Sequence, residues 1–183
     1  MKFLGGLCLL MISLWACSAP ADPATSLAEL KVLHERLRSL GADAPPGTVE
    51  ATVDTLLTAS EDFVRAFPRD TAAAHILFRA ANVAHGAGRF EQAIDLWDRV
   101  VDDYPQYAQR PDALFLQGFT ADKDLLEADR ATRYYEAFLQ QFPEHPMAKD
   151  VALLLQMLHR NQRPEDLIRS FPAPPDTTEA GLE

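Results

Sequence analysis

Apolar side chains recur at steps of three and four along residues 90–105, which read FEQAIDLWDRVVDDYP. This spacing places them on one face of an α-helix. Gly88 precedes the stretch and Tyr104-Pro105 ends it, because the residue before a proline is disfavoured in the α region. The pattern predicts an amphipathic helix whose apolar face consists of Phe90, Ala93, Ile94, Trp97, Val100, Val101 and Tyr104.

The same apolar pattern occurs twice more in the chain. One copy runs from Val53 to Phe67-Pro68, and the other from Ala128 to Phe142-Pro143. An internal repeat of this length is typical of proteins built from stacked helical units. The alternative is an ordinary helical bundle with accidental similarity. The shared spacing of three aromatic-proline ends argues against it.

Further helices follow from periodicity and from capping or breaking residues, and strand patterns are weak. The chain is therefore expected to be all-α, with eight helices in four pairs. Besides the helix already described and the one ending at Phe142, the expected helices run from Thr25 or Ser26 to about Leu40, from a Thr48 cap to Phe67, from Thr71 to His85, from Pro111 to about Asp122, from Pro146 to about Arg160, and from Pro164 to Phe171.

The first residues have the layout of a secretory signal peptide, with Lys2, an apolar run and a small residue before Cys17. The run is shorter than the roughly 20 apolar residues that span a bilayer. Leu14-Trp15-Ala16-Cys17 resembles the bacterial lipobox, although Trp15 departs from the usual small residue. This resemblance implies a signal peptide over residues 1–16 and lipidation of Cys17. The alternative is ordinary secretion with a spare cysteine.

Cysteine content and charge limit the remaining possibilities. The only other cysteine, Cys8, would leave with the signal peptide, so no intramolecular disulfide is expected. The formal charge of −10 disfavours nucleic-acid binding, which depends on phosphate neutralisation. It also disfavours charge-driven binding to anionic lipid, so membrane attachment would require the lipid anchor. Residues 17–25 are expected to be a tether and residues 173–183 a disordered tail.

Residues 74–105 resemble a tetratricopeptide repeat (TPR). Ala81 and Ala93 stand at the small positions where two helices cross, Gly88 stands in the turn, and Phe90 and Pro105 follow. The resemblance implies a right-handed superhelix of antiparallel helix pairs, with about three and a half to four pairs between residues 26 and 172. In the next unit Gly118 and Ala131 form the small pair. Small residues allow paired helices to approach closely.

A leader with a lipobox followed by TPRs further resembles BamD-type outer-membrane assembly lipoproteins and Tol-Pal-associated TPR proteins. TPR proteins usually bind peptides in a groove lined by the first helix of each pair. The resemblance puts this groove at His75, Phe78, Asn82, His85, Asp112, Phe115, Phe119, Leu153 and Met157. A carboxylate-clamp TPR would need Lys where Phe78 stands and Arg where Leu154 stands, so that type of groove is not supported. The same apolar residues could instead belong to the core.

No constellation for chemistry is present in the sequence. Metal, thiol, phosphate-loop and serine-hydrolase motifs are absent, and the five histidines are scattered. We therefore expect a non-enzymatic scaffold without cofactor or metal, anchored by lipid to the periplasmic face of the outer membrane. Its partner would be a protein or peptide segment and not nucleic acid, and its role would be in outer-membrane or envelope assembly. The alternatives are a structural subunit of a permanent envelope complex and a soluble secreted adaptor.

Overall fold

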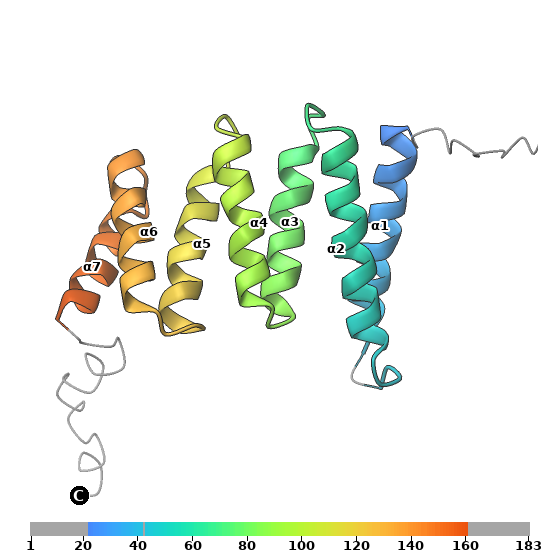
Figure 1. Cartoon of the computed structure of the whole chain (residues 1–183), viewed down its shortest axis with the longest axis horizontal. Helices are drawn as coiled ribbons and strands as arrows, with labels where there is room; N and C mark the ends of the chain where they lie inside the picture. The colour runs from blue at the N-terminus through green and yellow to red at the C-terminus, as the bar shows by residue number, and fades with distance from the viewer. Residues whose placement is uncertain (1–21, 42, 161–183) are drawn as a thin grey trace, which may run out of the picture.

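The computed structural model describes residues 22–41 and 43–160. Within them the chain is entirely helical, with α1 Pro23–Ser39, α2 Thr48–Ala66, α3 Ala73–Gly86, α4 Phe90–Asp103, α5 Arg110–Lys123, α6 Ala128–Gln141 and α7 Ala148–His159. Consecutive helices run antiparallel and form the principal contacts (Figure 1). The predicted all-α fold is confirmed. The predicted helix Pro164–Phe171, the leader, Cys17 and the tail lie outside the described residues.

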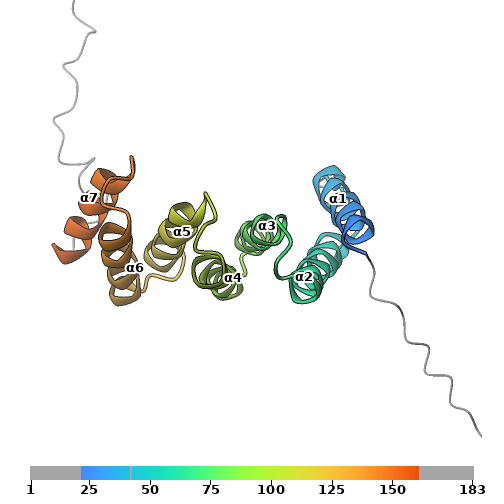
Figure 2. The ribbon, with the colours of Figure 1, turned by 90° about the horizontal axis from the view of Figure 1, so that it is seen from above.

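The helices form two rows. Seen from above, α1, α3, α5 and α7 lie on one side, and α2, α4 and α6 lie on the other (Figure 2). At the two ends of the stack, α1 and α7 lie further to the odd-numbered side than α3 and α5, so the row of helices is concave on that side. We call the side of α1, α3, α5 and α7 the odd face, and the side of α2, α4 and α6 the even face.

Small residues stand where paired helices cross, as the sequence predicts. Ala81 and Ala93 are completely buried between α3 and α4, and Ala131 is completely buried between α5 and α6. Gly118 on α5 lies directly against the ring of Tyr135 on α6. The close approach leaves large side chains to fill the spaces between units, and Trp97, Tyr135 and Phe138 are fully enclosed.

The three aromatic-proline ends are also confirmed. Phe67 and Phe142 each end a helix, and their backbone N–H groups donate to Phe63 and Phe138. Tyr104 follows the end of α4 in a similar backbone conformation. The aromatic rings pack back onto the helix, with centroid distances of 5.2 Å for Phe63–Phe67 and 5.6 Å for Phe138–Phe142. The ends at Phe67 and Phe142 therefore close their helices with both a backbone hydrogen bond and an aromatic contact.

Helix starts differ from the expectation in several places. Asp22, and not Thr25 or Ser26, caps α1, because its carboxylate accepts from the N–H groups of Ala24 and Thr25 at 2.9 and 3.1 Å. This cap and Pro23 in the first turn extend the helix into the expected tether. Gly47, in the left-handed region at φ 79°, precedes α2 in place of a Thr48 side-chain cap.

Two other helices begin two residues later than expected. The Asp70 carboxylate accepts from the N–H of Ala72 at 2.8 Å and holds a turn there, so α3 begins at Ala73 and not at Thr71. Pro146 lies before α7, which begins at Ala148, and the ring nitrogen of His145 bonds the Met147 N–H at 3.3 Å. Local side-chain bonds to the backbone compete with the first helical turn at both places.

Candidate functional site: the odd face

The outward-facing strip of α3 consists of the exposed His75 and Asn82 and the half-buried Arg79, spaced four and three residues apart. The opposite side of this helix is buried through Leu77, Ala81 and Ala84, so the strip faces outward from the odd-numbered row. Asn82 is oriented by the indole of Trp97, whose N–H donates to the Asn82 side-chain oxygen at 3.2 Å. The strip is polar along its whole length.

The corresponding strip of α5 is apolar and aromatic. Phe115 and Phe119 are half-buried, and their ring centroids lie 5.8 Å apart. Phe115 also stacks on the buried ring of Tyr135, with centroids 6.4 Å apart, and this contact fixes its orientation. Asp112, at the start of the same helix, is half-buried too. The helix thus carries an aromatic pair that packs on Tyr135, and the Asp112 carboxylate lies nearer the N-terminus of the same helix.

Three predicted groove residues connect α3 to the following helix pair. Phe78 is buried against Tyr107, with ring centroids 6.0 Å apart. A His75 ring nitrogen lies 3.2 Å from the Tyr107 hydroxyl, which donates to Gln109 at 2.6 Å. His85 bonds the Asp124 carboxylate at 2.9 Å. α3 is therefore linked to the segments directly before and after α5.

The last described helix contributes one prominent apolar side chain. Leu153 is 51% exposed, whereas Met157, one turn further along α7, is buried. Of the predicted groove residues, Phe78 and Met157 are therefore covered by neighbouring side chains. His75, Asn82 and Leu153 are exposed, and Asp112, Phe115, Phe119 and His85 are half-buried. The accessible apolar part of the odd face is centred on α5 and α7.

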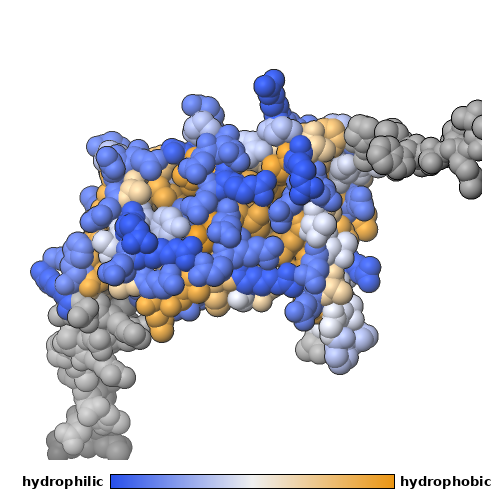
Figure 3. All heavy atoms as spheres, viewed as in Figure 1, coloured by the Kyte–Doolittle hydropathy of each residue, from blue (hydrophilic) through white to orange (hydrophobic). Residues whose placement is uncertain are grey.

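Charge is distributed unequally between the two faces. The two even-face helices α2 and α4 carry nine acidic residues against two arginines: Glu50, Asp54, Glu61, Asp62, Glu91, Asp95, Asp98, Asp102 and Asp103 against Arg65 and Arg99. The odd-face helices α1 and α3 carry two acidic residues against four basic ones: Glu29 and Glu35 against Lys31, Arg36, Arg38 and Arg79. The face seen in Figure 3 is largely covered by hydrophilic residues. The acidity of the chain is thus concentrated away from the odd face.

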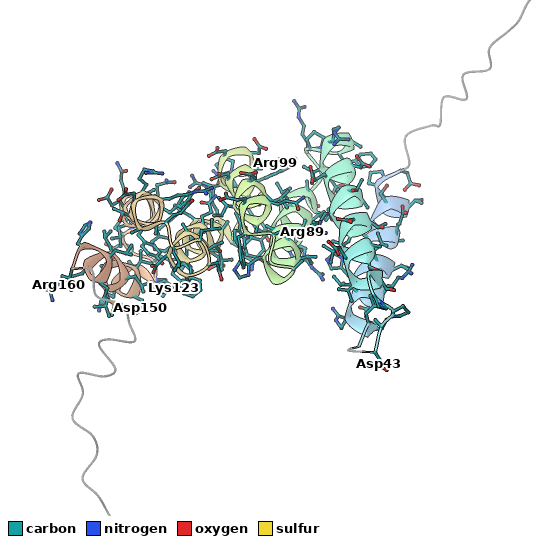
Figure 4. The ribbon with its side chains drawn as sticks, turned by 60° about the horizontal axis from the view of Figure 1, so that its bottom comes forward. Asp43, Arg89, Arg99, Lys123, Asp150 and Arg160 are labelled. Atoms are coloured by element: carbon teal, nitrogen blue, oxygen red, sulfur yellow. The ribbon has the colours of Figure 1, made fainter. Side chains whose placement is uncertain are left out.

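Arginines connect neighbouring units on the even face. Arg89 pairs with Asp54, Arg99 lies 3.7 Å from Glu61, and Arg130 lies 2.7 Å from Glu91. In Figure 4 Arg99 lies on the side of α4, whereas Lys123 and Asp150 lie on the opposite side of the stack. These exposed or half-exposed pairs are worth about 0–1 kcal/mol each. They partly neutralise the acidic helices.

The described residues contain no group of three or more metal-ligating side chains that could hold an ion. Over the same residues, no helix is long and apolar enough to cross a membrane. Buried polar groups occur between helices: the Gln117 amide donates to Asp98, whose pKa is raised mainly by burial. Burial likewise raises the pKa of Tyr135, so its phenol stays neutral. These groups serve packing between α4, α5 and α6.

The geometry of paired helices, small crossing residues and aromatic-proline ends agrees with a comparison against protein families. The family described as tetratricopeptide repeat matches residues 76–107 and 112–145. Two segments of the chain thus match this repeat. The first matched segment includes most of α3 and all of α4, and the second includes most of α5 and all of α6. A comparison with curated proteins gives no match.

Two residues of the odd face, Tyr107 and His34, were not predicted from the sequence. Tyr107 lies in the connection before α5, yet it covers Phe78 across 29 positions of the chain. His34 lies on α1, outside both matched repeats, and no repeat register places it beside α3. An aromatic residue just after the Tyr104-Pro105 end was the available indication for Tyr107. No pattern in the sequence pointed to His34.

Proposed function

We propose that this chain is a non-enzymatic scaffold that binds a segment of a partner protein on the odd face of its TPR repeats. TPR repeats are typical of protein-interaction scaffolds. The observation that carries the proposal is the half-buried pair Phe115 and Phe119, on the helix that begins the second repeat. Aromatic side chains with part of their surface open to solvent are common anchors in protein interfaces.

The aromatic pair is suited to binding because it is already ordered. Tyr135 behind Phe115 holds the ring in place, so a partner would not have to immobilise it. Leu153 on α7 adds a second apolar side chain with 51% of its surface exposed. An extended or helical segment of the partner could place one apolar residue on each of these two positions. The scaffold would hold and orient this segment without covalent chemistry.

The test is site-specific crosslinking in cells followed by a binding assay. A photoactivatable residue at position 119 should capture a partner, and the same residue at Val49 on α2 should not. Val49 is a matched control because it is 45% exposed and lies on the even face. Phe119→Glu should then reduce recovery of the captured partner at least tenfold, while Val49→Glu leaves recovery unchanged. Both variants should keep the helical circular dichroism of the parent.

Equal recovery of the partner with Phe119→Glu would contradict binding at the aromatic pair. In that case a second candidate gains weight, in which the chain is a structural subunit of a permanent complex. Among the described helices, α7 makes its principal contacts with α6, and its side chain Leu153 is exposed. For that function Leu153→Glu should break the complex, while Phe119→Glu should not.

We further propose that the scaffold is a lipoprotein on the periplasmic face of the outer membrane, with a role in envelope assembly. The support is the leader of residues 1–16 and the lipobox-like sequence ending at Cys17. Metabolic labelling with palmitate should mark the parent chain and not Cys17→Ser. Labelling that persists in Cys17→Ser would contradict this anchor but would leave the binding proposal intact.

A further inference from the structure

A basic cluster lies on the part of the odd face formed by α1 and α3, and it consists of His34 and Arg38 of α1 with His75 and Arg79 of α3. One ring nitrogen of His34 bonds the Leu30 carbonyl oxygen at 2.9 Å. The other is enclosed and has no hydrogen-bond partner among residues 22–41 and 43–160. The pKa of His34 is lowered mainly by burial, and the positive charges of Arg79, Arg38 and His75 lower it further. Arg38, His75 and Arg79 therefore lie within electrostatic range of His34.

The charge of Arg79 is not matched by a nearby acid. Arg38 pairs with Glu35 at 2.7 Å, an exposed contact within one helix. Arg79 is half-buried, and no carboxylate lies within ion-pair distance of it in the described part of the chain. By contrast, Arg89, Arg99 and Arg130 each reach an acid on a neighbouring helix. A partly desolvated arginine without a counter-ion favours the binding of an anion.

The cluster is basic, whereas the molecule as a whole is acidic. The chain as a whole has a formal charge of −10, and α2 and α4 concentrate the acidic residues on the even face. A polyanion such as nucleic acid would be repelled by most of this surface. A short peptide with one or two acidic side chains can reach the cluster from the odd face and avoid the even face. Charge complementarity thus favours an acidic protein segment.

We propose that the α1–α3 part of the odd face binds an acidic side chain of the partner segment, while Phe115 and Phe119 bind an apolar residue further along the same segment. This inference rests on the proposed function and specifies the chemistry of its partner. The Arg79 guanidinium would donate to the carboxylate, and the exposed side chain of His75 would add a donor. Arginine suits this task because its planar group can make two parallel bonds to one carboxylate.

The two subsites are close enough for one extended segment. Tyr107 contacts Phe78 and His75, and Asp124 contacts His85, so α3 and the second repeat adjoin without an intervening element. Packed helices lie 8–10 Å apart, and an extended chain advances about 3.3 Å per residue. In the odd-numbered row α3 lies next to α5, and α1 lies one place further away (Figure 2). One to two of these spacings, about 8–20 Å, therefore separate the two subsites, and the acidic and the apolar residue should be roughly three to six positions apart.

The experiment uses a displayed library of random 12-residue peptides selected against the purified chain. The parent should enrich peptides in which Asp or Glu stands roughly three to six positions from an aromatic or large aliphatic residue. Arg79→Glu should lose the enrichment for Asp and Glu and should favour Lys or Arg at that place. Arg133→Glu is the matched control, because Arg133 is exposed on α6 of the even face and the charge change is the same.

One selected peptide is then synthesised with a fluorescent label, and its affinity is measured by anisotropy. Arg79→Glu should weaken binding about tenfold or more, Arg133→Glu should not, and replacing the acidic residue of the peptide by Lys should restore binding to Arg79→Glu. Peptides that depend on Phe119 but show no preference for acids would overturn this inference and leave the proposed function standing. A library that yields no binder to the parent would overturn both.

Discussion

Gly118 offers the most direct test of how the repeats pack. A methyl group at this position would stand 2.7 Å from two ring carbons of Tyr135 and 3.2 Å from the Cβ of Tyr134. Carbon atoms pack best at about 3.5–4.0 Å. The Tyr135 ring is fully buried and stacks against Phe115, so it has little room to move away. Gly118→Ala should therefore push α5 and α6 apart or force the ring out of position.

The expected magnitude is the difference of two opposing effects. Overpacking a close-packed site costs about 1–3 kcal/mol. Alanine in a helix interior is favoured over glycine by about 1 kcal/mol. Since the methyl group has no open direction, overpacking should win, and Gly118→Ala should destabilise the protein by up to about 2 kcal/mol. For a domain of this size that lowers the melting temperature by up to about 8 °C.

Gly86→Ala is the matched control, because Gly86 ends α3 and a methyl group there would meet no atom within 4 Å. It should leave stability unchanged or raise it by up to about 1 kcal/mol. Urea unfolding followed by circular dichroism at 222 nm would measure both variants, and transition midpoints are compared because repeat proteins can depart from two-state behaviour. If the two substitutions shift the midpoint in the same direction and by the same amount, the close approach at Gly118 has no energetic consequence and the reasoning is refuted.

Two further predictions concern the core and α1. Trp97→Ala should destabilise the protein by about 3–5 kcal/mol, because the ring is 1% exposed and its N–H bond to Asn82 is lost too; differential scanning calorimetry would show it, and a loss below about 1 kcal/mol would contradict the packing. His34 has a lowered pKa when folded, so the unfolded chain binds more protons between that pKa and about 6.5, and stability should fall as the pH is lowered through this range. Unfolding midpoints measured across the range should depend less on pH in His34→Gln, and an identical dependence would rule out this contribution.

The fold could be predicted because its determinants are local in sequence. The apolar period of residues 90–105 gives one helix face, and the prolines after Tyr104, Phe67 and Phe142 mark where helices end. Helix starts were less predictable. Asp22 caps α1 through its own side chain, and a choice among Asp22, Thr25 and Ser26 depends on which carboxylate or hydroxyl meets the free N–H groups. Adjacent candidates of similar chemistry cannot be ranked from the sequence.

For the odd face, the sequence predicted only the side of its helix on which each residue lies. Repeat register places Phe78 and Phe115 at corresponding positions, yet Tyr107 buries the first while the second stays half-open. The difference arises from a residue in the connecting segment, whose position depends on the tertiary fold. The same holds for His34 and Arg79, which come from helices separated by α2 in the sequence. Periodicity assigns a face to each side chain but does not identify its neighbour on another helix.

The dominance of contacts between consecutive helices has a consequence for opening of the molecule. Each helix from α2 to α6 has principal contacts with a helix on both sides, whereas α1 and α7 have principal contacts with one described helix each, α2 and α6. An end helix can therefore detach when one principal interface is lost, while a helix in the middle must lose two. Amide hydrogens should exchange with solvent earliest in α1 and α7 and latest in α3, α4 and α5. The stack should therefore open from its ends inward, and the aromatic pair on α5 lies in the part that opens most slowly.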